Sequence, residues 1–221
     1  MKQKVFKFII AVLLLPFCAG GIRTLGFLIK ASGAADIVWV PLLAGIGCWL
    51  AVYGLMPRPM RVYVFGHELT HAFWTILFGG KVKRFKVSKK SGYVAVTKEN
   101  FLIYLAPYFF PIYAILICVV YGISSLFFDI QKYRPLFHFF LGAAYAFHVT
   151  FTANVLQTRQ ADISTQGHFF SWVIIALGNI FVLAVGLPVL SGFSVMTSLK
   201  MWLLNSIYYY EKVFALIRNV F

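Results

Sequence analysis

Long apolar runs constrain the fold of this chain more strongly than any other feature of its sequence. Several runs reach about 20 residues, the length that crosses a bilayer as a helix. Hydrophobic residues make up 61% of the 221 residues and charged residues only 12%, whereas soluble domains carry about 25% charged residues. We therefore expect an all-α polytopic membrane protein, because a helix satisfies its own backbone hydrogen bonds in lipid.

Six apolar segments predict about six transmembrane helices. The first, residues 1–21, has the basic start and small-residue end of a signal peptide, and we expect it to remain as an anchor that extends towards Ile29. Pro107 and Pro111 are expected to kink the fourth segment. The remaining segments are 37–56, 58–78, 101–128, 136–156 and 169–190.

Two further segments differ from the spans. Residues 81–97 place β-branched and aromatic residues on both sides of Ser88-Lys89-Lys90-Ser91-Gly92, which predicts a membrane-associated β-hairpin. An ordinary basic surface loop is the alternative. Residues 195–221 separate polar from apolar positions at helical spacing, which predicts an amphipathic helix in the membrane interface. The whole chain, 1–221, is expected to form one membrane-embedded domain with a core over 58–170.

The basic charge of the chain points to lipid. The formal net charge is +14, and the basic residues gather in short loops and at helix ends, where they meet anionic lipid headgroups. We expect no nucleic-acid partner, and we expect a multi-pass protein of a bacterial cell membrane. The three cysteines fall in apolar segments without paired spacing and predict no disulfide.

His67, Glu68 and His71 form a His-Glu-x-x-His motif within segment 58–78. Residues four apart share one face of a helix, so the two imidazoles can bind one Zn²⁺. Glu68 then lies beside the metal and can take a proton from water as general base. Chance would produce this motif on the order of 0.002 times in a chain of this composition. The alternative is a hydrogen-bonded cluster inside a helix bundle.

A third zinc ligand is required, because a catalytic site usually has three protein ligands and one open position. Four of the six acidic residues fall in predicted loops or interfacial segments: Asp36, Glu99, Asp129 and Glu211. With Glu68 as the base, Asp162 is left, and a helix break after the fifth span would present its carboxylate. A helix cap or an ion pair with Arg159 is the other interpretation of Asp162.

Histidines outside the motif compete with Asp162 as ligands. His148, in the fifth span, is the main competitor, whereas His138 and His168 lie at span ends and are expected at the interface. For each of the three, a histidine hydrogen-bonded within the bundle is the more common situation.

The His-Glu-x-x-His motif and the segment around Asp162 together resemble the site-2 protease family of intramembrane zinc metalloproteases, in a form without a PDZ or CBS domain. That family follows its His-Glu-x-x-His motif with Asn-x-x-Pro-x-x-x-Leu-Asp-Gly, whose aspartate binds zinc. Here Asn154 precedes Asp162 by the same eight residues. The other positions of this second motif differ: Gln157 replaces the proline, Ala161 the leucine and Ile163 the glycine. Residues 80–88 also resemble the family's hairpin, which guides substrate towards the metal.

The resemblance implies a zinc-dependent endopeptidase that cleaves transmembrane proteins or peptides within the bilayer. His67, His71 and Asp162 would hold Zn²⁺, Glu68 would be catalytic, and Asn154 would bind substrate. Two other functions remain open. A non-catalytic binding or assembly factor would have a structural site closed by a fourth ligand, such as His148, or a lost metal site. A metal transporter would need further acidic residues within the membrane, and this chain has few.

Overall fold

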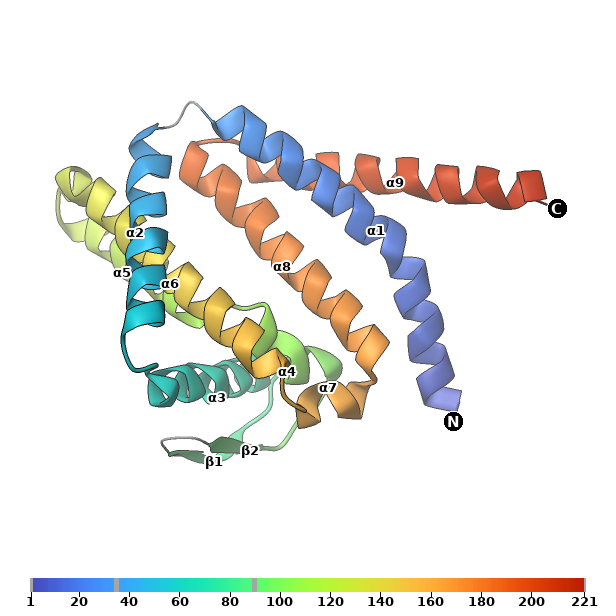
Figure 1. Cartoon of the computed structure of the whole chain (residues 1–221), viewed down its shortest axis with the longest axis horizontal. Helices are drawn as coiled ribbons and strands as arrows, with labels where there is room; N and C mark the ends of the chain where they lie inside the picture. Colours follow the sequence, from blue (N-terminus) through green and yellow to red (C-terminus); the bar gives the residue numbers. More distant parts are fainter. Residues whose placement is uncertain (1, 34–35, 89–90, 221) are drawn as a thin grey trace. The chain divides into compact units, whose positions relative to one another are not determined.

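The computed structural model describes residues 2–33, 36–88 and 91–220. They form two compact units, one from the described parts of 1–35 and 161–221 and one from those of 36–160. The elements, with η for a 3-10 turn, are α1 (Lys2–Ser32), α2 (Asp36–Leu55), α3 (Met60–Leu77), β1 (Val82–Val87), β2 (Gly92–Val96), α4 (Phe101–Leu105), η1 (Ala106–Tyr108), α5 (Ile112–Phe127), η2 (Gln131–Tyr133), α6 (Arg134–Leu156), α7 (Ala161–Gln166), α8 (His168–Ser191) and α9 (Val195–Val220) (Figure 1).

The helices fit an all-α membrane protein with one small sheet. Among the described residues, four helices are long and apolar enough to cross a membrane: α1, α2, α6 with η2, and α8. The pair α4–η1 and α5 gives a fifth if it counts as one span, and the two parts are bent by 83°. The sequence predicted about six spans. The motif helix α3 is not among the candidates, because Arg61 and the ionisable motif residues lower its hydropathy.

Two glycines bring α2 and α6 close together in the unit formed by residues 36–160. A side chain at Gly45 would meet the backbone of Phe139, and one at Gly142 would meet the backbone of Leu42. Small residues of this kind let helix backbones approach closely in membrane proteins. Figure 1 shows α3 running across the end of this helix pair, with the β-hairpin on its other side.

Aromatic packing fixes α3 against α6. Tyr63 and Val64 of α3 form a buried cluster with Phe147 and Phe151 of α6, and the rings of Tyr63 and Phe151 stack 5.2 Å apart. Aromatic pairs at this separation contribute about 0.5–1.5 kcal/mol beyond the area they bury. The His-Glu-x-x-His motif therefore lies on a helix whose first turn is packed against α6.

The C-terminal end of α3 leads directly into the predicted hairpin. Gly79 has φ 71°, in the left-handed region that favours glycine, and the backbone N–H of Gly80 donates to the carbonyl of Thr75. Strands β1 and β2 then pair antiparallel, with Phe85 opposite Val94, which confirms the hairpin. Lys89 and Lys90 of its predicted turn lie outside the described residues.

The other unit packs α1 against α8 and α9. Gly20 lies against Ser206, and the indole N–H of Trp202 donates to the carbonyl of Phe17 at 2.8 Å. The first half of α9 is therefore packed against other helices, whereas the sequence predicted an interfacial helix over the whole of 195–221. From Ile207 onward α9 exposes large apolar side chains, including Phe214.

Candidate metal centre

The two motif histidines converge on one point. They project from successive turns of α3, and the Nε2 atoms of His67 and His71 lie 3.2 Å apart. Two nitrogens bound to one tetrahedral Zn²⁺ at about 2.0–2.1 Å would be separated by about 3.4 Å. The observed separation is close to this edge length. The pair of imidazoles therefore fits a tetrahedral metal ion without a change of helix geometry.

A backbone carbonyl sets the orientation of His71. Its Nδ1 lies 2.8 Å from the carbonyl oxygen of Ile103 in α4, so Nδ1–H donates and Nε2 keeps its lone pair for a metal. In a regular helix the Ile103 carbonyl would accept from the N–H of residue 107. Residue 107 is proline and has no N–H. Pro107 thus leaves the Ile103 carbonyl available to His71, which is a consequence of the predicted break in the fourth segment.

Replacing Pro107 by alanine should weaken metal binding. The new N–H at residue 107 would compete with His71 for the Ile103 carbonyl, and loss of such a supporting bond typically lowers metal affinity by about 10–100-fold. Zinc affinity measured by competition with a chelating dye would test this. Pro111→Ala is the matched control, because residue 111 lies between η1 and α5 and is not the residue whose N–H would reach the Ile103 carbonyl in a continued helix. Equal affinities of the two variants would contradict this role of Pro107.

Glu68 of α3 is buried where the helix faces the hairpin. Only 8% of its surface is exposed, and Gly92, the first residue of β2, lies directly against it. A Cβ atom added at Gly92 would stand 2.7 Å from Cγ and 3.0 Å from Oε1 of Glu68, and 2.8 Å from Cγ1 of Val64. Real Cβ atoms essentially never approach so closely. Glycine at this position therefore lets the hairpin backbone pack onto the Glu68 side chain.

Asp162 lies in the first turn of α7, the short helix that follows the predicted break after α6. Within its own unit α7 is held from two sides, because Lys7 donates to the Gln166 side chain at 2.6 Å and Ser171 donates to the Ile163 carbonyl at 3.2 Å. His67, His71 and Asp162 each offer one atom of a kind that binds metal ions, an imidazole nitrogen from each histidine and a carboxylate oxygen from Asp162.

The competing histidines are placed differently. His138 is buried and its Nδ1 bonds the carbonyl of Ile37 at 3.1 Å, which confirms the expected histidine hydrogen-bonded within the bundle rather than an exposed interfacial one. His168 is exposed at the start of α8. His148 is buried in α6. Within the described parts of the chain, the group of possible metal ligands includes none of these three.

Asn154, the candidate substrate-binding residue, lies in the last turn of α6. Its amide Nδ2 donates to the hydroxyl of Tyr53 in α2 at 3.3 Å, and its side chain is half-buried. This bond orients the amide, and its role towards a substrate stays a prediction. Sequence reasoning missed the roles of Ile103 and Gly92. Only Pro107 gave a signal, as a helix breaker.

No protein-family model, curated protein or solved structure matches this chain. The resemblance to the site-2 protease family therefore rests on the motif residues and their spacing.

Proposed function

We propose that this protein is an intramembrane zinc metalloprotease of the site-2 protease type. The observation that carries the proposal is the pair of Nε2 atoms 3.2 Å apart on α3, with Glu68 between them in sequence. Asp162 would supply the third ligand, which leaves one tetrahedral position open for chemistry. The exclusion of His148 from the ligand group supports an open site over a closed structural one.

The residues of this site suit peptide hydrolysis. His67, His71 and Asp162 would hold Zn²⁺, which would lower the pKa of a bound water towards 7 and polarise the scissile carbonyl. Glu68 takes one proton from the attacking water and delivers it to the departing amine, so that the peptide bond is replaced by a carboxyl and an amine. Asn154, oriented by Tyr53, would hold the substrate backbone.

The proposed substrates are transmembrane proteins or peptides in the surrounding bilayer. A helical substrate hides its carbonyls in backbone hydrogen bonds and must unwind before attack. The hairpin supports this step, because a two-stranded sheet keeps an unpaired edge that can accept an extended peptide. The proposal also places the chain in a bacterial cell membrane as a multi-pass protein.

One observation favours a second candidate function. A separation of 3.2 Å between imidazole nitrogens is also a hydrogen-bond distance, so His67 and His71 could bond each other without metal. The protein would then be a non-catalytic binding or assembly factor of the membrane. The two candidates differ in metal content and in catalysis.

Purification in detergent, followed by elemental analysis and a cleavage assay with a fluorogenic transmembrane peptide, tests the proposal. We expect about one zinc per chain, loss of cleavage by more than about 100-fold after dialysis against 1,10-phenanthroline, and recovery when Zn²⁺ is restored. A protein that holds zinc but cleaves no such peptide would favour a structural site. A protein that takes up no metal would favour the metal-free factor.

A further inference from the structure

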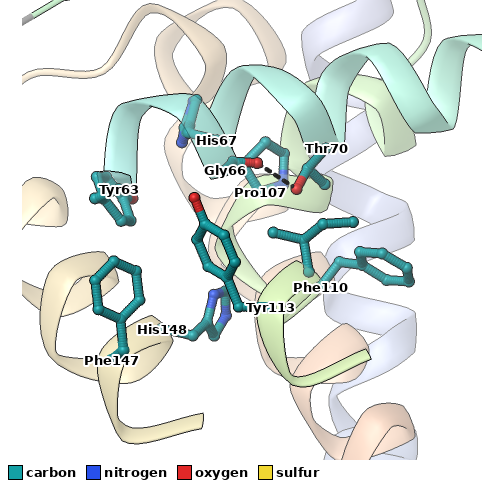
Figure 2. Close-up of a pocket in the computed structure, with 10 residues that line it drawn as sticks. Tyr63, Gly66, His67, Thr70, Pro107, Phe110, Tyr113, Phe147 and His148 are labelled. Atoms are coloured by element: carbon teal, nitrogen blue, oxygen red, sulfur yellow. Dashed lines mark hydrogen bonds between the residues drawn. The ribbon is translucent and has the colours of Figure 1, made fainter. Parts of the chain in front are cut away.

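His67 and His148, from two different helices, line the same small cavity. Its volume is about 20 Å³, and it lies within the unit that holds α3, α5 and α6. Figure 2 shows His67 of α3 on one side and His148 of α6 on the other, with the ring of Tyr113 from α5 beside them. The rest of the lining is largely apolar, with Tyr63 and Phe147 among its residues.

His148 carries an unused hydrogen-bonding group at this cavity. The side chain is 7% exposed, and its buried Nε2 has no hydrogen-bond partner among the described residues. A buried polar nitrogen without a partner is costly and calls for an explanation. His138, ten residues earlier on the same helix, is also buried but bonds the carbonyl of Ile37. The two histidines therefore differ in how far their hydrogen-bonding capacity is used.

The size and polarity of the cavity indicate what His148 could bind. About 20 Å³ accommodates one water molecule or one carbonyl oxygen. The hydroxyls of Thr70 and Tyr113 already donate to the carbonyls of Gly66 and Val62, so neither can donate to a carbonyl oxygen placed in the cavity, whereas His148 can. A substrate carbonyl oxygen is held in place by its own chain and needs only a donor.

We propose that His148 is a substrate-binding residue, whose Nε2–H donates a hydrogen bond to the carbonyl oxygen of the peptide bond under attack. This inference rests on the proposed function and extends it, because His148 is assigned a contact with substrate and no contact with metal. The carbonyl oxygen gains negative charge as water adds to the carbon, so the bond to His148 strengthens during the reaction. Its loss should therefore lower kcat more than it raises KM.

Three variants test the assignment. His148→Phe fills the site without a donor, His148→Gln supplies an amide N–H, and His138→Phe is the matched control on the same helix. We expect His148→Phe to lower kcat by about 10²–10³-fold with unchanged zinc content, and His148→Gln to recover part of that loss. His138→Phe should leave kcat near the wild-type value in the fraction that folds.

A second measurement does not depend on catalysis. The protein loaded with Co²⁺ is titrated with acetohydroxamate, whose carbonyl oxygen can accept from His148, and the visible spectrum is followed. We expect the spectrum without acetohydroxamate to be the same in wild type and His148→Phe, and the dissociation constant to rise about 10-fold in the variant. A changed starting spectrum would identify His148 as a ligand and overturn the proposal.

The outcomes separate this inference from the proposed function. An unchanged acetohydroxamate affinity and kcat in His148→Phe would overturn the role of His148 and leave the protease intact. Equal losses in His148→Phe and His138→Phe would reduce the effect to packing and also overturn it. The protein could also bind Co²⁺ and show a His148-dependent affinity for acetohydroxamate but cleave no peptide. That result would support His148 as a hydrogen-bond donor to a carbonyl oxygen and would reject the protease function. A protein that binds no Co²⁺ would reject both.

Discussion

Replacing Glu68 by glutamine is expected to lower cleavage of a transmembrane peptide by about 10²–10⁴-fold, the usual contribution of a general base. Glutamine has nearly the same shape and can occupy the same buried position between α3 and the hairpin. It cannot accept a proton from the attacking water. Because Glu68 is no metal ligand in this mechanism, the zinc content should stay at the wild-type value.

The control for this prediction is another glutamate of the same unit. Glu99 is exposed and accepts a bond from the hydroxyl of Tyr104 at 2.6 Å, so Glu99→Gln changes the same charge outside the motif. Its cleavage rate should match the wild type. Equal rates for wild type and Glu68→Gln would remove Glu68 from the chemistry, and a simultaneous loss of zinc would show that Glu68 supports the metal site.

Sequence periodicity predicted the helices and the hairpin because both depend on local signals. The end of α3 near Gly79 and the break near Pro107 follow from the backbone preferences of glycine and proline, which can be read directly from the sequence. The split of the fourth segment into α4 and α5 followed from Pro107 and Pro111. The position of α9 depended on contacts with distant residues, such as Trp202 with Phe17, and no local pattern indicates such a pairing.

The candidate site shows the same division. The spacing of His67 and His71 alone predicts that their imidazoles converge, since four residues make about one helical turn. The bond from His71 to Ile103 joins residues 32 positions apart, and the contact of Gly92 with Glu68 depends on how the hairpin folds back onto α3. Such supporting contacts come from tertiary packing, which the motif does not encode.

Removal of the Asp162 carboxylate should abolish tight metal binding. Zinc prefers an anionic oxygen to a neutral amide. Both Asp162→Asn and Asp162→Ala are therefore expected to weaken zinc affinity by more than about 100-fold. A direct ligand should matter at least as much as a supporting group, whose loss lowers metal affinity by about 10–100-fold. Peptide cleavage at limiting zinc should fall in parallel. A chelating-dye competition measures the affinity. Asp129→Asn, in the loop after α5, removes the same charge at a distance from the motif and should bind zinc as the wild type does.

The contacts that hold α7 give this prediction a second, independent test. Lys7 anchors the far end of the helix through Gln166, so Lys7→Met should loosen the presentation of Asp162 while leaving its carboxylate in place. We expect a weaker zinc affinity in Lys7→Met, by less than in Asp162→Ala, because the ligand is still present but less well positioned. Wild-type affinity in Asp162→Ala would exclude Asp162 as a ligand, and the two histidines would then need a different third partner.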